Sequence, residues 1–463
     1  MERKKHKIKR FIKNQYNINS IDIKSSIKQI LEQIEISEKS AQINFPPEMS
    51  KSIDSLGNKK TKPTFYVGTA GNIYIYWKQY LFHDKNKEYL EKFHESLKTN
   101  LSIIEEKDSD DINNSFFMGY SGIYLFYCIY ECEIKHKENF EKYFNILIDL
   151  KKCSERKYAE VELLYGATGY LYSLLFLKKY LSSKDNNNNV AEYKKYIPIL
   201  DSSIIDIFNL LLNKGIHFMN EYEWNKSLLF PFSLKPTKTP KFYLGAAHGL
   251  IGALYMLLST IKFFPELLKK ELILDDKKST IKKLIFDNLK YIQSLQIKET
   301  GNFPSDVQGH DSGEKVHFCH GCIGSIYLFL LAEEFFPNNG FKETSFLCNK
   351  CLWERGLLYK GNGLCHGMSG IVYALIKLYK YSKNELYLKE AVGICYGTFD
   401  YDIQELVKNF VDPQRKCKGI PDTPYSLMEG EGGCLVMYYD LASILLKKDN
   451  SDFTGFFPGY EIF

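Results

Sequence analysis

The sequence predicts an all-α protein in which about seven inner and seven outer helices form a double-layered α/α toroid. Three observations lead to this prediction: a glycine motif that recurs along the chain, an apolar segment after each copy, and amphipathic segments between the copies. At 463 residues the chain is long for one hydrophobic core, unless internal repeats close it into a single body.

The repeated motif is Gly-x-x-Gly followed by aromatic and aliphatic residues. The first glycine suits the tight turn into a helix, and the second lets that helix start close to a neighbour. A helix without a polar face is buried on all sides, so these segments are predicted to form the inner layer. The seven first glycines are Gly68, Gly119, Gly166, Gly249, Gly321, Gly367 and Gly430.

Amphipathic segments between the motifs are predicted to form the outer layer. In residues 86–106 apolar side chains recur every three to four positions, which is typical of a half-buried helix. Residues 20–37 predict a further amphipathic helix before the first repeat, with Ser20 as its N-cap. We therefore expect a basic arm plus this helix over residues 1–59 and the toroid over residues 60–463.

Charge and cysteine content narrow the class of protein. The net charge is +5, but the first thirteen residues hold seven Lys or Arg and one Glu, so the rest is close to neutral and no nucleic-acid surface is indicated. The basic arm is expected to be a solvated tail, with contact to an anionic membrane as the alternative. Eleven cysteines with no secretion signal or uninterrupted membrane-length apolar run indicate reduced thiols and a cytoplasmic location.

Two Cys-His-Gly tripeptides indicate a metal site. In a repeat toroid the Gly-x-x-Gly turns lie at the same end, so the residues just before them meet on one rim. Cys319 and Cys365 stand two positions before a first glycine, and His320 and His366 stand one position before it. Thiolates and imidazoles brought together in this way are zinc ligands.

Three other interpretations of these residues compete with an open three-ligand site. The pairs Cys319-x-x-Cys322 and Cys348-x-x-Cys351 have the spacing of a four-cysteine structural zinc site. A Cys-x-x-Cys pair can also act in redox chemistry, although no βαβ pattern surrounds either pair. Finally, both cysteines and both histidines of the tripeptides can close the zinc site, and register alone does not exclude this.

Further polar residues share the register of the tripeptides. His248 and Glu429 directly precede first glycines, and Glu162 stands four positions before one. Taken singly, such a histidine is more often a capping or core residue, and such a carboxylate a partner of the helix dipole. Their common place on the rim makes them candidates for function.

Several long motifs resemble a known family. They are the two CHG tripeptides, YLGAAHGLIG, ELLYGATGYLY, GLLYKGNGLCHG, PDTPYSLMEGEGG and the FPGYEIF ending. Together they are similar to the eukaryotic LanC-like proteins, relatives of the bacterial lanthionine (lantibiotic) cyclases, over roughly residues 60–463.

The resemblance implies an activity and a cofactor. One zinc ion would be held by Cys319, Cys365 and His366, with His320 outside the coordination sphere and the fourth position left for water or a thiol. The thiol would be glutathione, which adds to a dehydroalanine or dehydrobutyrine residue of a protein or peptide and forms a thioether. We therefore expect a zinc-dependent glutathione transferase, a thioether-forming enzyme like the lanthionine synthetases.

The resemblance also implies roles for single residues. His248 would protonate the enolate formed by addition, Glu162 would orient that histidine, and His320 would donate to the enolate oxygen. Lys360 and Arg10, the latter in an Arg-x-x-x-Asn-x-Tyr motif, would bind the carboxylates of glutathione.

Two positions depart from the family pattern, and two rival functions remain. Ala167 and Gly419 stand where the family usually has arginine; beside the second, Lys418 would be a non-equivalent substitute in binding a glutathione carboxylate. A non-catalytic glutathione-binding scaffold or signalling adaptor is the main rival. A carbohydrate-active toroid with paired carboxylates is the other, and it would have no need of Cys319 or Cys365.

Overall fold

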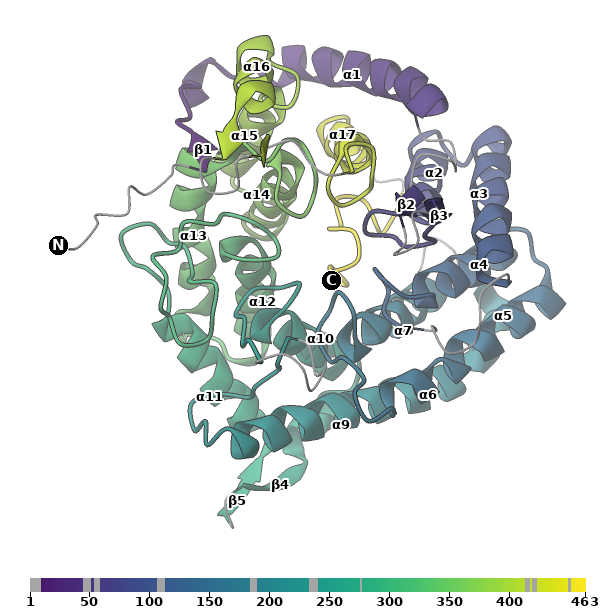
Figure 1. Cartoon of the computed structure of the whole chain (residues 1–463), viewed down its shortest axis with the longest axis vertical. Coiled ribbons are helices and arrows are strands. Elements are labelled where there is room, and N and C mark those ends of the chain that lie inside the picture. The colour runs from purple at the N-terminus through teal and green to yellow at the C-terminus, as the bar shows by residue number, and fades with distance from the viewer. Residues whose placement is uncertain are drawn as a thin grey trace.

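The structure, a computed structural model, describes residues 10–44, 51–53, 59–105, 113–183, 190–232, 240–274, 277–412, 417–418, 423–448 and 451–463. Helices dominate it and are arranged in two concentric layers, with the C-terminus at the centre of the ring (Figure 1). The predicted all-α toroid is confirmed.

The inner layer consists of helices that begin at the repeated motif, as predicted. α12 starts directly after Gly321 and α14 directly after Gly367, and both are buried along most of their length. The inner helices are α2 (Gly71–Phe82), α4 (Ser121–Glu133), α7 (Ala167–Ser182), α10 (Leu250–Phe263), α12 (Cys322–Phe335), α14 (Met368–Ser382) and α17 (Glu431–Leu445).

Outer helices cover the inner ones. The helix predicted over residues 86–106 is α3, which packs on α2 and α4 and buries Phe93, Leu97 and Ile104. Positions four and seven residues apart lie on one face of a helix, so these residues form the apolar stripe seen in the sequence. The outer helices between the repeats are α3 (Lys87–Glu105), α5 (Lys137–Asp149), α9 (Ile197–Glu221), α11 (Ile281–Ser294), α13 (Phe341–Arg355) and α15 (Glu385–Tyr396).

The N-terminal helix α1 (Ile23–Asn44) starts later than predicted. Ser20 is not its N-cap, because it ends a short 3-10 turn, η1 (Ile18–Ser20). Asp22 takes that place: its carboxylate accepts backbone hydrogen bonds from Lys24 (3.3 Å) and Ser25 (3.1 Å). A carboxylate has two oxygens for the free N–H groups of a helix start, whereas a serine hydroxyl has one.

α1 packs on α17, with Ile30 and Ile34 buried. It therefore shields the last inner helix, and it lies along the outside of the ring beside α15 and α17 (Figure 1). The sequence places this helix before the first repeat, but its packing partner belongs to the seventh. The domain boundary at residue 59 stays a prediction.

Residues 191–221, which comprise the 3-10 turn η4 (Ala191–Tyr196) and α9, are long and apolar enough to span a membrane by length and composition. In the fold, α9 packs on α7 and α10 as an outer helix. Its buried positions, among them Leu200, Ile204 and Leu211, account for the high mean hydropathy.

The turns before the inner helices are joined into a rim by backbone hydrogen bonds. The N–H of Cys365 donates to Met428 (2.8 Å), that of Met428 to Tyr66 (3.1 Å) and that of Tyr66 to Phe117 (3.2 Å). Each of these residues stands two positions before the first glycine of its repeat. Equal register in the sequence therefore becomes proximity in space, as the repeat predicts.

The first glycines are needed because these turns are tight. A Cβ atom on Gly430 would lie 2.0 Å from the carbonyl oxygen of Pro424, and one on Gly249 would lie 2.2 Å from that of Tyr243. Gly321 has a φ of +113°, which side chains rarely allow.

The C-terminal segment, residues 451–463, fills the centre of the ring (Figure 1). Phe453 packs against Trp77, with ring centroids 5.7 Å apart, and Phe457 stacks on Phe318 at 4.4 Å. The hydroxyl of Tyr460 donates to the carbonyl of Gly324 (3.1 Å) at the start of α12. The segment therefore supports the rim from inside, through Phe318 and the start of α12.

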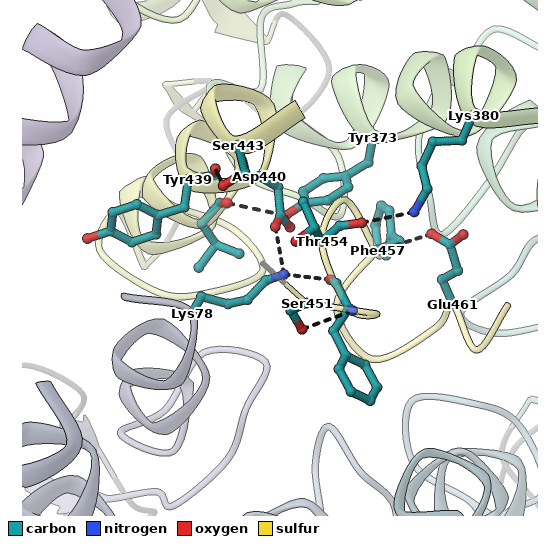
Figure 2. A network of polar contacts seen from close by, with 12 residues as sticks. Lys78, Tyr373, Lys380, Tyr439, Asp440, Ser443, Ser451, Thr454, Phe457 and Glu461 are labelled. Atoms are coloured by element: carbon teal, nitrogen blue, oxygen red, sulfur yellow. Dashed lines mark hydrogen bonds and ion pairs between the residues drawn. The ribbon is translucent and has the colours of Figure 1, made fainter. Parts of the chain in front are cut away.

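A polar network ties this segment to the inner helices away from the rim (Figure 2). The ammonium of Lys78 donates to Asp440 (2.7 Å) and to the carbonyl of Phe453 (2.9 Å). Tyr373 donates to the other oxygen of Asp440 (2.6 Å). All of these groups are buried, so each needs its partners.

The loops between the helices contain short antiparallel strand pairs. β1 (Phe11–Ile12) pairs with β6 (Leu357–Leu358), which brings the N-terminal segment to the loop before α14. The other pairs are β2 (Lys51–Ile53) with β3 (Lys59–Thr61), β4 (Glu271–Leu274) with β5 (Lys277–Thr280), and β7 (Val411–Asp412) with β8 (Cys417–Lys418). The remaining short helical elements are α6 (Lys151–Ser154), η5 (Pro265–Lys269) and α16 (Tyr401–Asn409).

Candidate active site

Cys319, Cys365 and His366 meet on the rim. The turns before α12 and α14 are joined by a hydrogen bond from the N–H of Phe318 to the carbonyl of Cys365 (2.7 Å). The two sulfurs and an imidazole nitrogen lie within 4.8 Å of one another, with both cysteines buried. Zinc binds sulfur and nitrogen at about 2.0–2.3 Å, so the group is compact enough to share one ion.

The electrostatics of the two thiols reflect their closeness. A hydrogen bond from Cys365 lowers the pKa of Cys319, whereas burial and the neighbouring sulfur raise the pKa of Cys365. Burial lowers the pKa of His366, but the charge and hydrogen bond of Cys365 outweigh burial and raise it overall. A cation between the two sulfurs would offset their mutual repulsion, so the donor set fits a zinc ion.

No fourth His, Cys, Asp or Glu completes this group within the described residues. The His320 ring lies instead against Tyr243, with ring centroids 4.9 Å apart, and beside His248 at 5.9 Å. The geometry thus speaks against the closed site in which both histidines are ligands.

The four-cysteine hypothesis also fails on geometry. Cys322 lies at the start of α12 and hydrogen-bonds with Cys348 and Cys351 of α13, and all three are fully buried. Cys319 belongs to the other group. Hydrogen bonds with the two neighbouring thiols and burial raise the pKa of Cys322, and the three cysteines form part of the packed interior.

His248 and Glu162 form a pair beside the metal-ligand group. The Nδ1 atom of His248 lies 3.1 Å from Glu162, whose carboxylate also accepts the backbone N–H of Leu164 (3.0 Å) and Tyr165 (2.5 Å). These bonds fix the carboxylate, which in turn fixes the imidazole. Burial alone would lower the pKa of His248, but Glu162 and the charge of Cys365 raise it.

His320 stays neutral on the same rim. Burial and the charge of Lys315 lower the pKa of His320 to about 3. Its Nδ1 atom is buried and has no hydrogen-bond partner among the described residues. A buried nitrogen without a partner is costly, so its place fits a contact with a bound molecule, as the resemblance implies.

The two predicted glutathione contacts also lie close to this group. Pairing of β1 with β6 brings Arg10 next to Tyr359, whose N–H donates to the Arg10 carbonyl (3.4 Å). Asn14 anchors the same segment by donating to the carbonyl of Trp353 (2.9 Å). Lys360 follows in the loop, and its charge counters the rise in the pKa of His366. The third candidate, Lys418, lies in β8, but its side chain is outside the described residues.

Sequence reasoning missed two residues of the site. Tyr66 lies half-buried beside the two cysteines; desolvation and their negative charge raise its pKa, and its hydroxyl hydrogen-bonds to Cys365. Tyr66 stands two positions before Gly68, so the register that singled out the cysteines could have found it. Lys315, four residues before Cys319, carries no comparable signal in the sequence.

Glu429, the remaining rim candidate, lies beside His366. Its carboxylate is 3.9 Å from the Nε2 atom of that histidine and accepts a hydrogen bond from the hydroxyl of Thr423 (2.9 Å). A carboxylate in this place can orient a ligand histidine.

Comparison with known proteins shows which family the chain resembles. Residues 59–458 match the family model of lanthionine synthetase C-like proteins. The chain belongs to this family. A zebrafish (Danio rerio) member named glutathione S-transferase LANCL1 is 28% identical over 333 residues, which are 71% of this chain and 69% of the relative. LanC-like protein GCL1 of Arabidopsis thaliana is 27% identical over 302 residues, or 65% of this chain and 58% of that protein.

Among solved structures, nisin cyclase aligns with 92% of this chain and 97% of its own, at 15% identity and a TM-score of 0.49. In this lanthionine synthetase C-like protein, the structure brings together most of the site residues that the resemblance predicted. Cys319, Cys365, His366, His248 and Glu162 lie together on one rim, with His320 beside them.

Proposed function

We propose that this protein joins glutathione to dehydroalanine or dehydrobutyrine residues of proteins or peptides through a thioether bond. The observation that carries the proposal is that a three-donor zinc-type group and a carboxylate-oriented histidine lie side by side on one rim. The name of the zebrafish relative, a glutathione S-transferase, supports glutathione as the thiol.

Cys319, Cys365 and His366 would hold the zinc ion. When bound there, zinc favours the thiolate form of an incoming thiol at neutral pH. Tyr66 hydrogen-bonds to Cys365 and Glu429 lies beside His366, so two of the ligands are held in place by neighbouring side chains.

His248 would deliver the proton that completes the addition. The sulfur forms a bond to the β-carbon, the carbon–carbon double bond opens, and its electron pair moves toward the carbonyl as an enolate. A proton then goes to the α-carbon, and nothing leaves. Glu162 raises the pKa of His248 even though burial opposes it, which favours the protonated form that a general acid needs.

His320 is placed to donate to the enolate oxygen. Because burial lowers its pKa to about 3, the ring is neutral and carries a single N–H, so it would donate there in the tautomer that has this proton on Nδ1, the nitrogen without a partner among the described residues. Lys360 and Arg10 would bind carboxylates of glutathione beside His366. We keep the cytoplasm as the expected location, since glutathione holds thiols reduced there.

Mass spectrometry tests the proposal. Purified protein incubated with glutathione and a dehydroalanine peptide should give an adduct heavier by one whole glutathione, because addition expels nothing. The same protein treated with a chelator should give much less adduct. Absence of an adduct with protein that carries one zinc per chain would contradict the proposal.

A further inference from the structure

A cavity of about 620 Å³ lies at the end of the inner helices opposite the rim. It is bounded by the last turn of α14, by the chain at the end of α17 and by the C-terminal segment. A cavity of this volume is large enough for a small molecule. It is separate from the metal-ligand group, because the inner helices begin at the rim and end here.

The charged side chains that line this cavity are three lysines and one carboxylate, namely Lys380, Lys383, Lys447 and Asp452. Among the described residues, none of the three lysines forms an ion pair with a carboxylate. The carboxylate of Asp452 accepts a hydrogen bond from the hydroxyl of Ser183 (2.6 Å). The cavity therefore has an excess of positive charge.

Lys380 is half-buried, and two contacts hold its ammonium group. The group donates to the carbonyl of Thr454 (2.9 Å) and lies 4.4 Å from the centre of the Phe456 ring (Figure 2 shows the first contact). Neither contact supplies a full negative charge, and burial lowers the pKa of Lys380. A half-buried cation is unfavourable unless an anion neutralises it.

Lys179 is a second half-buried cation close to this cavity. Its ammonium group lies 4.8 Å from the centre of the same Phe456 ring. It makes no hydrogen bond or ion pair within the part of the chain that the structure describes. Burial lowers the pKa of Lys179 to about 8, and the charge of Asp452 opposes this effect only in part. Lys179 therefore adds to the uncompensated positive charge at this end.

Other lysines toward the same end of the inner helices do have carboxylate partners. These ion pairs are Lys78 with Asp440, Lys178 with Asp201, Lys262 with Glu334, Lys377 with Glu461 and Lys448 with Asp84. The fold thus neutralises these lysines within the chain, whereas the lysines around the cavity remain for an anion from outside it.

The lining favours phosphate groups over carboxylates. Lysine is a compact point charge that suits phosphate, whereas the planar arginine side chain suits paired contacts with a carboxylate. The described lining contains lysines and no arginine. The hydroxyls of Ser451 and Thr454 also line the cavity and can donate hydrogen bonds to phosphate oxygens.

The charge balance indicates the number of phosphate groups. Four lysines against one carboxylate leave an excess of three positive charges. A phosphate monoester carries about −1.5 to −2 at neutral pH. Two phosphate groups therefore match the charge better than one.

We propose that this cavity binds a molecule with two phosphate groups, held by Lys380, Lys383 and Lys447. A soluble sugar bisphosphate and the head group of a lipid bisphosphate share this chemistry, and the experiment distinguishes them. The inference is independent of the proposed function.

The test compares the double variant Lys383→Ala with Lys447→Ala and the unchanged protein. Both lysines are exposed, so the fold should persist, and circular dichroism checks this. Calorimetric titration with fructose 1,6-bisphosphate should show affinity weakened about tenfold or more in the double variant, because charged contacts are lost. Fructose 6-phosphate, which has one phosphate, should bind the unchanged protein about tenfold more weakly than the bisphosphate. Lys380→Met should also weaken binding of the bisphosphate.

The matched control is the double variant Lys282→Ala with Lys283→Ala. These two exposed lysines lie on the outer helix α11, so the control loses the same charge away from the cavity and should leave the titration unchanged. Co-sedimentation with phosphatidylcholine vesicles that contain phosphatidylinositol 4,5-bisphosphate tests the lipid source. Sedimentation that the Lys383 and Lys447 variant loses would identify a lipid head group, and titration of the sugar bisphosphate alone a soluble molecule.

Three results would overturn the inference. The first is equal affinity of the Lys383 and Lys447 variant and the unchanged protein for the bisphosphate. The second is an equal loss in the α11 control, which would indicate an effect of net charge alone. The third is that the unchanged protein binds neither the sugar bisphosphate nor the vesicles. Each of these results leaves the proposed function standing, because adduct formation is measured separately.

Discussion

Two ion pairs toward the ends of the inner helices and three cations at their beginnings differ in whether these charged side chains have partners of opposite charge. Toward the ends of the helices, Lys78 and Asp440 form a buried ion pair at 2.7 Å (Figure 2). Lys377 is paired with Glu461 there as well (2.6 Å). Where the helices begin, Lys315, Lys360 and Arg10 remain without anionic partners among the described residues.

This difference distinguishes polar groups that stabilise the fold from polar groups that are available to a bound molecule. The paired charges hold the C-terminal segment in the ring, so their bonds are completed within the chain. The rim holds cations without partners, an unpartnered imidazole nitrogen on His320 and three metal donors, so its bonds are completed by something else. Variants at the two ends should therefore fail in different ways.

The largest effect is expected for Cys319→Ala. Removal of one of three protein donors should reduce bound zinc from about one per chain to near zero and abolish adduct formation, because the remaining two donors hold the ion weakly. Elemental analysis measures the zinc, and circular dichroism should show an unchanged helical fold. Cys128→Ala, a buried cysteine of α4, is the control. Full zinc content in Cys319→Ala would remove the basis of the proposed site.

At the other end, Asp440→Ala should mainly destabilise the fold. It leaves Lys78 buried without its counter-charge, which should cost about 3–5 kcal/mol of the free energy of unfolding. Urea unfolding monitored by circular dichroism measures the loss. The double variant Lys78→Met with Asp440→Leu should recover most of it, since the buried charges are then gone together. A loss below about 1 kcal/mol would show that the pair is not needed.

On the rim, His248→Ala should impair chemistry without unfolding the protein. We expect addition to slow about 100-fold, a typical effect of losing a general acid, while zinc content and glutathione affinity persist. This outcome also separates the enzyme from the rival scaffold, in which His248→Ala would change nothing. Initial rates of adduct formation, with glutathione titrated in parallel, decide between them.

Glu162→Gln should shift the pH profile rather than abolish activity. Glu162 raises the pKa of His248 against the opposing effect of burial. The acid form of His248 is lost as pH rises through that pKa, so the rate should fall on the alkaline side. Without the carboxylate charge the pKa drops, and the fall should begin at a lower pH. An unchanged profile would mean that His248 is not the titrating acid.

The smallest effect is expected for Tyr66→Phe. The hydroxyl makes one hydrogen bond to Cys365, worth about 1 kcal/mol, so zinc affinity should weaken about fivefold. Competition with a chromophoric chelator measures this change. Tyr120→Phe offers a control on the same side of the ring, because Tyr120 is likewise a tyrosine of a motif turn and its side chain is buried. Equal losses in both variants would argue against a specific role for Tyr66.

Local patterns predicted much of this protein. The Gly-x-x-Gly motif and the apolar segment after it located the inner helices, and the period of the apolar residues located the outer ones. The shared register before each motif placed Cys319, Cys365 and His366 on one rim, because a repeated turn has the same geometry each time. The resemblance then pointed to the His248 and Glu162 pair. The prediction of the N-cap of α1 was wrong, because Asp22 and not Ser20 caps this helix.

Tertiary structure decided the contacts between distant parts of the chain. α1 covers the seventh inner helix, and Tyr16 reaches Asp400 (2.9 Å), pairings that no local pattern encodes. The pairing of β1 with β6 brings Arg10 to the rim. Only the folded chain shows that no carboxylate of the described residues forms an ion pair with Lys315. Periodicity and register arise from neighbours along the chain, whereas charge balance depends on which distant segments come together.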